Sequence, residues 1–207
     1  MFVKICGITN EADALLSVAL GADAVGFIFA PSSRQMSAKA VADIVKILPE
    51  DTLTVGVFRD IPAEQVIETA YTAGVKGVQL HGAETKQACK EISAAFSFVV
   101  KVFSLEMPQL AEANTYPVHA IMIDGAVPGS GQVYDYEQIG AFPLTSKLIL
   151  AGGLHPGNVA DAISKTHPWG VDVSSGVEKS PGIKDPRQLR LFIKNAKDAF
   201  SAEAGNM

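Results

Sequence analysis

The strongest constraint on the fold is a regular alternation of short apolar runs with longer amphipathic segments along the whole chain. The apolar runs are rich in Val, Ile and Phe and occupy residues 2–6, 23–29, 53–58, 77–80, 98–103, 118–123, 147–151 and 170–174. Segments with apolar residues three and four apart lie between most of them, at residues 10–20, 38–48, 63–73, 84–95, 156–165 and 186–198. This alternation predicts parallel strands connected by helices.

Eight strands in 207 residues, with no linker rich in Pro or Gly, favour a single-domain (β/α)8 barrel with eight parallel strands over residues 1–207. An open doubly wound sheet is the alternative, but it needs a terminal edge strand, and none is evident. Residues 105–115 support only a short helix, and residues 125–141 begin with a glycine-rich loop before a possible helical turn at 135–140. The last residues, 201–207, lack a periodic pattern and are expected to fray.

Composition excludes several classes of protein. A net charge of -5 and scattered basic residues argue against a nucleic-acid partner, which requires a basic face. No apolar run approaches the length of a membrane span, and no secretory signal is evident at the N-terminus. Two cysteines, Cys6 and Cys89, cannot form a disulfide framework and fit a reducing compartment. We therefore expect a cytoplasmic protein without nucleic-acid or membrane partners.

In a (β/α)8 barrel the chemistry lies at the carboxyl ends of the strands, and Cys6 ends the first one. Side chains alternate along a strand, so Phe2, Lys4 and Cys6 share one face. A neighbouring ammonium lowers the pKa of a thiol, which makes Cys6 a candidate base or nucleophile. The alternative is a small buried hydrophobic residue.

Asp124 ends the sixth run, and alternation directs its carboxyl inward over the barrel mouth. Burial there would favour the protonated form that a general acid needs. The alternative is a strand-end Asp that accepts hydrogen bonds from nearby backbone amides. Together, Cys6 and Asp124 form an acid/base pair suited to moving a proton within a substrate.

The last two strands run into loops of small residues that predict a phosphate site. One loop contains Gly152 and Gly153, and the other contains Ser175 and Gly176. Glycines allow the main chain to approach an anion, and a short helix starting near Ser175 would direct its N-terminal amides at it. Glycine pairs are also common in ordinary turns.

Arg34 follows the second strand, where a guanidinium could bind a carboxylate in a bidentate manner, although a solvated Arg is the alternative. Gln79 and His81 share the inward face of the fourth strand and could bind substrate, or His81 could be a structural donor. The histidines show no metal-ligand spacing, so no metal is expected. No serine lies in a nucleophile-elbow sequence.

The chain resembles the phosphoribosylanthranilate isomerase family in seven collinear segments between residues 4 and 178. These segments are Lys4-Ile5-Cys6-Gly7-Ile8-Thr9, Gly21-Ala22-Asp23-Ala24-Val25-Gly26-Phe27-Ile28-Phe29, Ser33-Arg34, Val55-Gly56-Val57-Phe58, Gln79-Leu80-His81-Gly82, Leu150-Ala151-Gly152-Gly153-Leu154 and Asp172-Val173-Ser174-Ser175-Gly176-Val177-Glu178. The resemblance implies a (β/α)8 barrel that catalyses the Amadori rearrangement of N-(5-phospho-β-D-ribosyl)anthranilate to 1-(2-carboxyphenylamino)-1-deoxy-D-ribulose 5-phosphate. This is the third step of tryptophan biosynthesis from chorismate via anthranilate, and it needs no cofactor.

The resemblance also implies roles for individual residues. Cys6 would be the general base that removes the proton from the sugar C2, and Asp124 the general acid that protonates the ring oxygen. Arg34 would bind the anthranilate carboxylate. The backbone amides of Gly152, Gly153, Ser175 and Gly176 would bind the sugar phosphate, while Gln79, His81 and Asp172 would contact the substrate or support residues that do.

Two departures from the family pattern are Arg59, where an apolar residue is usual, and Gly129-Ser130-Gly131-Gln132, where Gly-Gly-Thr-Gly is usual. They concern substrate contacts rather than the reaction. One alternative function is a related phosphate-binding barrel lyase similar to indole-glycerol-phosphate synthase, which uses a strand-end lysine and a glutamate where this chain has Cys6. The other is a non-catalytic phosphosugar-binding protein. No expectation for the oligomeric state follows from the sequence.

Overall fold

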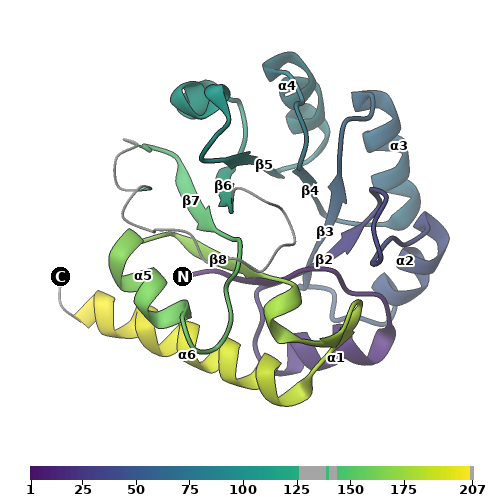
Figure 1. Cartoon of the computed structure of the whole chain (residues 1–207). Helices are drawn as coiled ribbons and strands as arrows, with labels where there is room; N and C mark the ends of the chain where they lie inside the picture. The colour runs from purple at the N-terminus through teal and green to yellow at the C-terminus, as the bar shows by residue number, and fades with distance from the viewer. Residues whose placement is uncertain (126–138, 140–143, 206–207) are drawn as a thin grey trace.

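The computed structural model describes residues 1–125, 139 and 144–205, and within them eight parallel strands form a closed barrel in sequence order. Figure 1 shows the barrel with its helices arranged around the outside. The strands are β1 (Val3–Ile5), β2 (Ala24–Ile28), β3 (Leu53–Phe58), β4 (Gly77–Leu80), β5 (Phe98–Ser104), β6 (Ala120–Asp124), β7 (Lys147–Leu150) and β8 (Gly170–Val173). The predicted barrel is confirmed, and each predicted strand is present.

The helices that cover the barrel are α1 (Glu11–Ala19), α2 (Ala38–Val45), α3 (Ala63–Ala73), α4 (Lys86–Ala95), α5 (Val159–Thr166) and α6 (Pro186–Gly205). The side chains of Asn10, Ser37 and Thr85 begin α1, α2 and α4 by accepting hydrogen bonds from backbone amides of the first turn. The weak segment after β5 contains a 3-10 helix, η1 (Pro108–Thr115). The glycine-rich loop and helical turn predicted within 125–141 lie largely outside the described residues.

Helix α6 is longer than the sequence pattern predicts. It continues to Gly205, although the periodic pattern indicates a helix only to residue 198 and fraying from residue 201. Its apolar side chains recur at threes and fours, and Leu189, Phe192, Ile193, Ala196 and Phe200 are all buried. Figure 1 shows α6 in yellow along one side of the barrel, beside α5.

The apolar core has two layers, separated by the barrel wall. Val3 and Ile5 of β1 point outward into the larger layer between strands and helices, whereas Phe2 belongs to the smaller layer inside the barrel. Phe2 stacks on Trp169 at 4.7 Å between ring centroids, at the amino-terminal end of the barrel. Because apolar rings fill that end, the polar site lies at the opposite end, where the strands finish.

The barrel closes through the pairing of its first and last strands. In this pairing Lys4 lies opposite Asp172, and Ile5 lies opposite Val173. Lys4 is fully buried, and its Nζ lies 2.8 Å from Oδ1 of Asp172, so an ion pair spans β1 and β8 inside the barrel. The shared face predicted for Phe2, Lys4 and Cys6 agrees with this contact.

A small antiparallel hairpin between β8 and α6 is absent from the sequence-based prediction. After β8 the chain forms a 3-10 turn, η3 (Ser175–Val177), in place of the short helix expected near Ser175. It then forms β9 (Glu178–Ser180) and β10 (Ile183–Lys184), which pair with each other. This hairpin places two charged side chains, Glu178 and Lys184, beneath the site described below.

No helix in the described part of the chain is long and apolar enough to cross a membrane. Within residues 1–125, 139 and 144–205, no cluster of three or more His, Cys, Asp or Glu side chains could hold a metal ion.

Candidate active site

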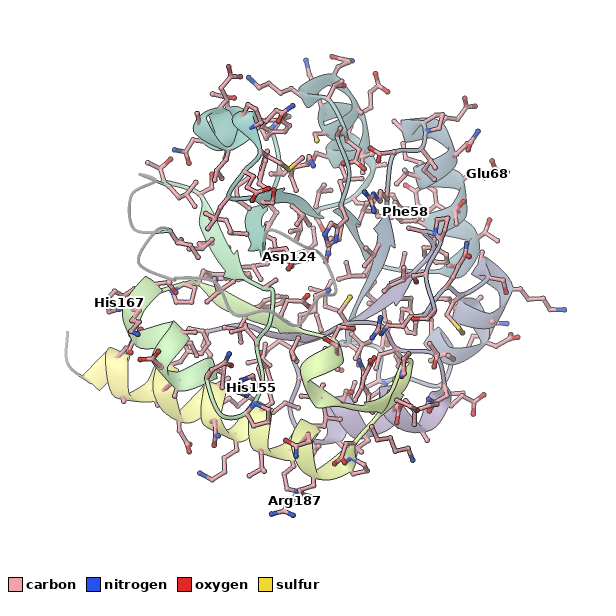
Figure 2. The ribbon with its side chains drawn as sticks, viewed as in Figure 1. Phe58, Glu68, Asp124, His155, His167 and Arg187 are labelled. Carbon is pink, nitrogen blue, oxygen red and sulfur yellow. The ribbon has the colours of Figure 1, made fainter. Side chains whose placement is uncertain are left out.

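A cavity of about 290 Å³ opens at the carboxyl ends of the strands. Seven of the residues predicted from the sequence line it: Cys6, Arg34, Gln79, His81, Asp124, Asp172 and Ser175. Figure 2 shows Asp124 near the middle of the ring of strands, whereas Glu68, His167 and Arg187 lie on the outside of the molecule. Strand ends that are distant in sequence thus contribute side chains to one space.

Cys6 directly follows β1 and is 5% exposed. Its backbone N–H donates to the carbonyl of Val173 at 2.8 Å, which continues the pairing of β1 with β8 beyond the last strand residue. This bond fixes the backbone of Cys6 at the edge of the cavity.

Burial is the largest influence on the pKa of the Cys6 thiol and raises it, because a buried thiolate loses its hydration. Lys4 opposes this effect by its charge and a hydrogen bond, and the pKa remains raised. Lys4 therefore acts in the direction that the sequence predicts, but it does not bring the pKa of the thiol below its ordinary value. Burial likewise disfavours the charged form of Lys4, but Asp172 and Cys6 outweigh it and raise the pKa of Lys4.

A glycine on β2 makes room for this pair. A Cβ atom built on Gly26 would lie 3.0 Å from Sγ of Cys6 and 3.0 Å from Nζ of Lys4. Contacts this short force the neighbouring atoms to move. The absence of a side chain at position 26 therefore allows thiol and ammonium to lie side by side.

The Asp124 carboxylate is held by one oxygen, and its other oxygen faces a histidine. Oδ1 accepts a hydrogen bond from the backbone N–H of Gly125 at 2.8 Å. This contact agrees with the alternative interpretation of Asp124 as a strand-end residue that accepts hydrogen bonds from backbone amides. Oδ2 lies 3.3 Å from Nε2 of His81. The Asp124 side chain is 14% exposed, so it remains accessible from the cavity.

Gln79 and His81 form a short polar chain that ends on Asp124. Nε2 of Gln79 lies 3.4 Å from Nδ1 of His81. If the amide of Gln79 donates here, the imidazole proton lies on Nε2, where it can be donated to Asp124. Oε1 of Gln79 is buried and has no hydrogen-bond partner among the described residues, which leaves an acceptor at the cavity.

Arg34 lines the cavity and is held by a carboxylate of its own chain. Its Nε lies 2.8 Å from Oε1 of Glu178, and its Nη2 lies 2.6 Å from Oε2. The hydrogen bonds to Glu178 raise the pKa of Arg34 against the opposing effect of its burial. The alternative of a solvated surface Arg does not fit this paired and largely buried side chain.

The two glycine-containing loops pack against the site and against each other. Gly152 and Gly153 have φ angles of +83° and +64°, which favour glycine. A Cβ on Gly152 would lie 2.7 Å from Oδ1 of Asp124, and one on Gly176 would lie 1.9 Å from the carbonyl oxygen of Leu154. From these two loops Ser174 and Ser175 line the cavity, whereas Gly152, Gly153 and Gly176 lie behind its lining and shape its surroundings.

Sequence-based reasoning did not identify Glu178, Lys184 or Gly26 as site residues. Glu178 and Lys184 are almost completely buried, although both carry charge. The available signal was a charged residue at each end of a short segment between the last strand and the last helix. Its meaning depends on a hairpin whose pairing the local pattern does not reveal.

This chain is similar to known proteins over nearly its whole length. Residues 3–195 match the model of the family described as N-(5'phosphoribosyl)anthranilate (PRA) isomerase. The chain belongs to this family. A relative from Desulforudis audaxviator, N-(5'-phosphoribosyl)anthranilate isomerase, is 41% identical over 202 residues, which cover 96% of this chain and 98% of the relative.

Solved structures of the family have the same architecture. The crystal structure of phosphoribosyl anthranilate isomerase from Thermus thermophilus has a TM-score of 0.90 and 38% identity, covering 96% of this chain and 99% of that one. A second isomerase, in complex with reduced 1-(o-carboxyphenylamino)-1-deoxyribulose 5-phosphate, has a TM-score of 0.85 and 38% identity over the same shares. The barrel and the isomerase family predicted from the sequence are both confirmed.

Proposed function

We propose that this isomerase converts N-(5-phospho-β-D-ribosyl)anthranilate to 1-(2-carboxyphenylamino)-1-deoxy-D-ribulose 5-phosphate, with Cys6 as general base and Asp124 as general acid. The observation that carries the proposal is the convergence of the two side chains on one cavity in a chain of this family. The lyase alternative is not favoured, because the family and the full-length relatives are isomerases.

The reaction needs one proton added and one removed while the furanose opens. Asp124 protonates the ring oxygen as the bond between that oxygen and C1 breaks, and the nitrogen lone pair forms a C1–N double bond. The thiolate of Cys6 then removes the proton from C2, and the electrons of that C–H bond form an enolamine. Tautomerisation gives the 2-ketone. Substrate and product are isomers, so the step consumes no oxidant or reductant.

Surrounding side chains prepare this pair for proton transfer. Lys4 opposes the effect of burial on the pKa of Cys6 and so favours the thiolate that must accept the C2 proton. His81 lies 3.3 Å from Asp124 and can donate to its carboxylate after the proton has left. Asp172, 2.8 Å from Lys4, keeps the ammonium charged inside the barrel.

Two anionic groups of the substrate provide anchors. We assign the aromatic carboxylate to Arg34, whose guanidinium lines the cavity. We assign the sugar phosphate to backbone amides of the loops that contain Gly152, Gly153, Ser175 and Gly176, because glycines allow close approach of an anion. We place the enzyme in the cytoplasm, where the free thiols of Cys6 and Cys89 remain reduced.

The test is turnover of freshly prepared phosphoribosylanthranilate, followed by loss of its fluorescence. We expect the wild-type chain to convert it, and Cys6→Ser or Asp124→Asn to lower kcat by about 10²–10⁴-fold, the usual contribution of one acid/base group. Cys89→Ser is the matched control, because Cys89 is a buried thiol on α4 outside the cavity. Its kcat should stay within a few-fold of wild type.

Two results would contradict the proposal. Wild-type conversion no faster than the spontaneous background would eliminate the isomerase and favour a phosphosugar-binding protein. Full activity in either Cys6→Ser or Asp124→Asn would remove that residue from its role. Circular dichroism spectra of all variants should match, so that a loss of activity reports on chemistry rather than on folding.

A further inference from the structure

The β9–β10 hairpin carries a buried carboxylate and a buried ammonium that contact each other beneath Arg34. Nζ of Lys184 lies 3.0 Å from Oε1 of Glu178, and the same carboxylate accepts three contacts from the guanidinium of Arg34. The exposed fractions of the Glu178 and Lys184 side chains are 3% and 0%. Burial of two charged side chains costs free energy unless the charges are paired and hydrogen-bonded.

Three acceptors around Nζ of Lys184 favour its ammonium form, against the burial that lowers its pKa. Besides Glu178, its Nζ donates to the carbonyl of Cys6 at 2.6 Å and to the carbonyl of Ser174 at 3.2 Å. A neutral amine has only two N–H donors, so three acceptors match the charged form. The two carbonyls belong to the residues that follow β1 and β8, and Lys184 therefore joins the ends of the strands that close the barrel.

Glu178 occupies only one edge of the Arg34 guanidinium. Within the part of the chain that the structure describes, every side-chain hydrogen bond of Arg34 goes to Glu178 and uses Nε or Nη2. A guanidinium has five N–H donors in a planar fork, so Nη1 and the second N–H of Nη2 form another edge for a carboxylate. Arg34 itself lines the cavity.

The charge count at this edge decides whether it can attract an anion. Arg34 and Glu178 alone would form a neutral pair, and a second carboxylate beside it would be repelled by the first. With Lys184 included, the three groups carry a net charge of +1. Nζ of Lys184 contacts Oε1 of Glu178, and Lys184 does not line the cavity. It therefore offsets the charge of the carboxylate without occupying the cavity.

We propose that Lys184 is a positioning residue for carboxylate recognition: it balances the charge of Glu178, so that Arg34, oriented by Glu178, keeps a net positive charge for the substrate carboxylate. This inference rests on the proposed function, in which Arg34 binds the aromatic carboxylate. It assigns the hairpin to substrate specificity, in addition to its structural role at the strand ends.

The experiment compares two ligands that differ in one carboxyl group. The first ligand is reduced 1-(o-carboxyphenylamino)-1-deoxyribulose 5-phosphate. The second is the same compound with a phenylamino group in place of the o-carboxyphenylamino group, so that it lacks only the carboxyl. The affinity of each is measured by calorimetry for wild type, Arg34→Met, Lys184→Met, Glu178→Gln and the double variant Glu178→Gln/Lys184→Met. The ratio of the two affinities is the carboxylate preference, and general damage to the site cancels in it.

Charge balance predicts a specific order of carboxylate preferences. Lys184→Met should lower the preference by about tenfold, the scale of one uncompensated charge near the ligand. The double variant keeps only the charge of Arg34 and should recover most of the preference. Glu178→Gln leaves two positive charges and should raise it, so this variant tests the proposal even if Lys184→Met does not fold.

The outcomes separate this inference from the proposed function. The assignment of the aromatic carboxylate to Arg34 fails if the wild type has no carboxylate preference. It also fails if Arg34→Met keeps the wild-type preference. If Arg34→Met loses the preference while Lys184→Met retains it, only the charge-balance inference fails. A double variant no better than Lys184→Met, or a lower preference in Glu178→Gln, would also overturn the inference and leave a purely structural hairpin.

Discussion

At position 152 a single methyl group should disturb the Asp124 carboxyl, the proposed general acid. The Cβ of Gly152→Ala would lie 2.7 Å from Oδ1 of Asp124 and 2.2 Å from the backbone nitrogen of Gly125. We expect kcat to fall by about tenfold or more, because a displacement of about 1 Å commonly costs that much or more. The measurement is the steady-state rate of the folded variant.

Gly74→Ala is the control for this change. Gly74 ends α3 with a φ of +68°, and its nearest contact would be Cγ1 of Val45 at 3.8 Å. Both variants carry the same backbone cost, about 1–2 kcal/mol for a left-handed conformation. Equal kcat values for the two variants would show that Gly152 does not act through Asp124.

Lys4 should be visible in the pH dependence of the reaction. Because the charge of Lys4 opposes the burial that raises the pKa of Cys6, Lys4→Met should raise this pKa further. A higher thiol pKa means less thiolate at a given pH, so the rise of kcat/KM with pH should move to higher pH. Lys46→Met, at an exposed lysine, should leave the profile unchanged.

The sequence was sufficient to bring Cys6 and Asp124 together. Each ends a strand, side chains alternate along strands, and parallel strands in a barrel share one carboxyl end. The same logic could not find Lys184, because its contacts to Cys6 and Ser174 depend on a chain reversal near Gly182. The raised pKa of Cys6 was also hidden, since burial outweighs the neighbouring charge only in the folded structure.

Among the elements, the β9–β10 hairpin depends most on charge. Burial raises the pKa of Glu178, but the hydrogen bonds and charges of Arg34 and Lys184 outweigh burial and lower it. A carboxyl with a lowered pKa stabilises the fold above the ordinary carboxyl range, and this contribution is lost as the pH falls below that range through the lowered pKa. We expect hydrogen exchange of the hairpin amides, corrected for intrinsic rates, to accelerate in acid before that of the barrel strands.

Glu178→Gln provides the control for this element. The glutamine cannot titrate, so the acid-induced difference between hairpin and barrel exchange should disappear. Retention of the difference in the variant would assign the acid sensitivity to another group.

The boundaries of the elements show what local patterns can predict. Strands β3 and β4 agree with their predicted ranges, because both faces are buried and the apolar runs stand out. The β9 and β10 strands are short, carry charges and contain an irregular register at Ile183 and Lys184. No periodicity of two can be detected over so few residues.

At the scale of the whole molecule, α6 covers the part of the barrel where the chain closes on itself. Leu189 on this helix is fully buried, whereas Leu191 is 36% exposed. Leu189→Ala should cost about 2–5 kcal/mol of unfolding free energy, and Leu191→Ala less than about 1 kcal/mol. Urea unfolding should show a lower midpoint for Leu189→Ala with an unchanged slope, because the barrel loses its structure as one unit.

Similar midpoints for the two leucine variants would mean that α6 contributes little to the stability of the barrel. A second transition in Leu189→Ala would mean that α6 unfolds separately. Either result would contradict a single cooperative structure in which the last helix stabilises the first strand.

The pairing of Lys4 with Asp172 has a consequence for the order of events during synthesis. Cys6, the proposed base, precedes most of the barrel in the chain, but its neighbouring ammonium on Lys4 depends on a carboxylate 168 positions later. The carbonyl of Cys6 depends on a lysine 178 positions later. A nascent chain therefore cannot assemble the surroundings of the Cys6 thiol until β8 and the β9–β10 hairpin have emerged.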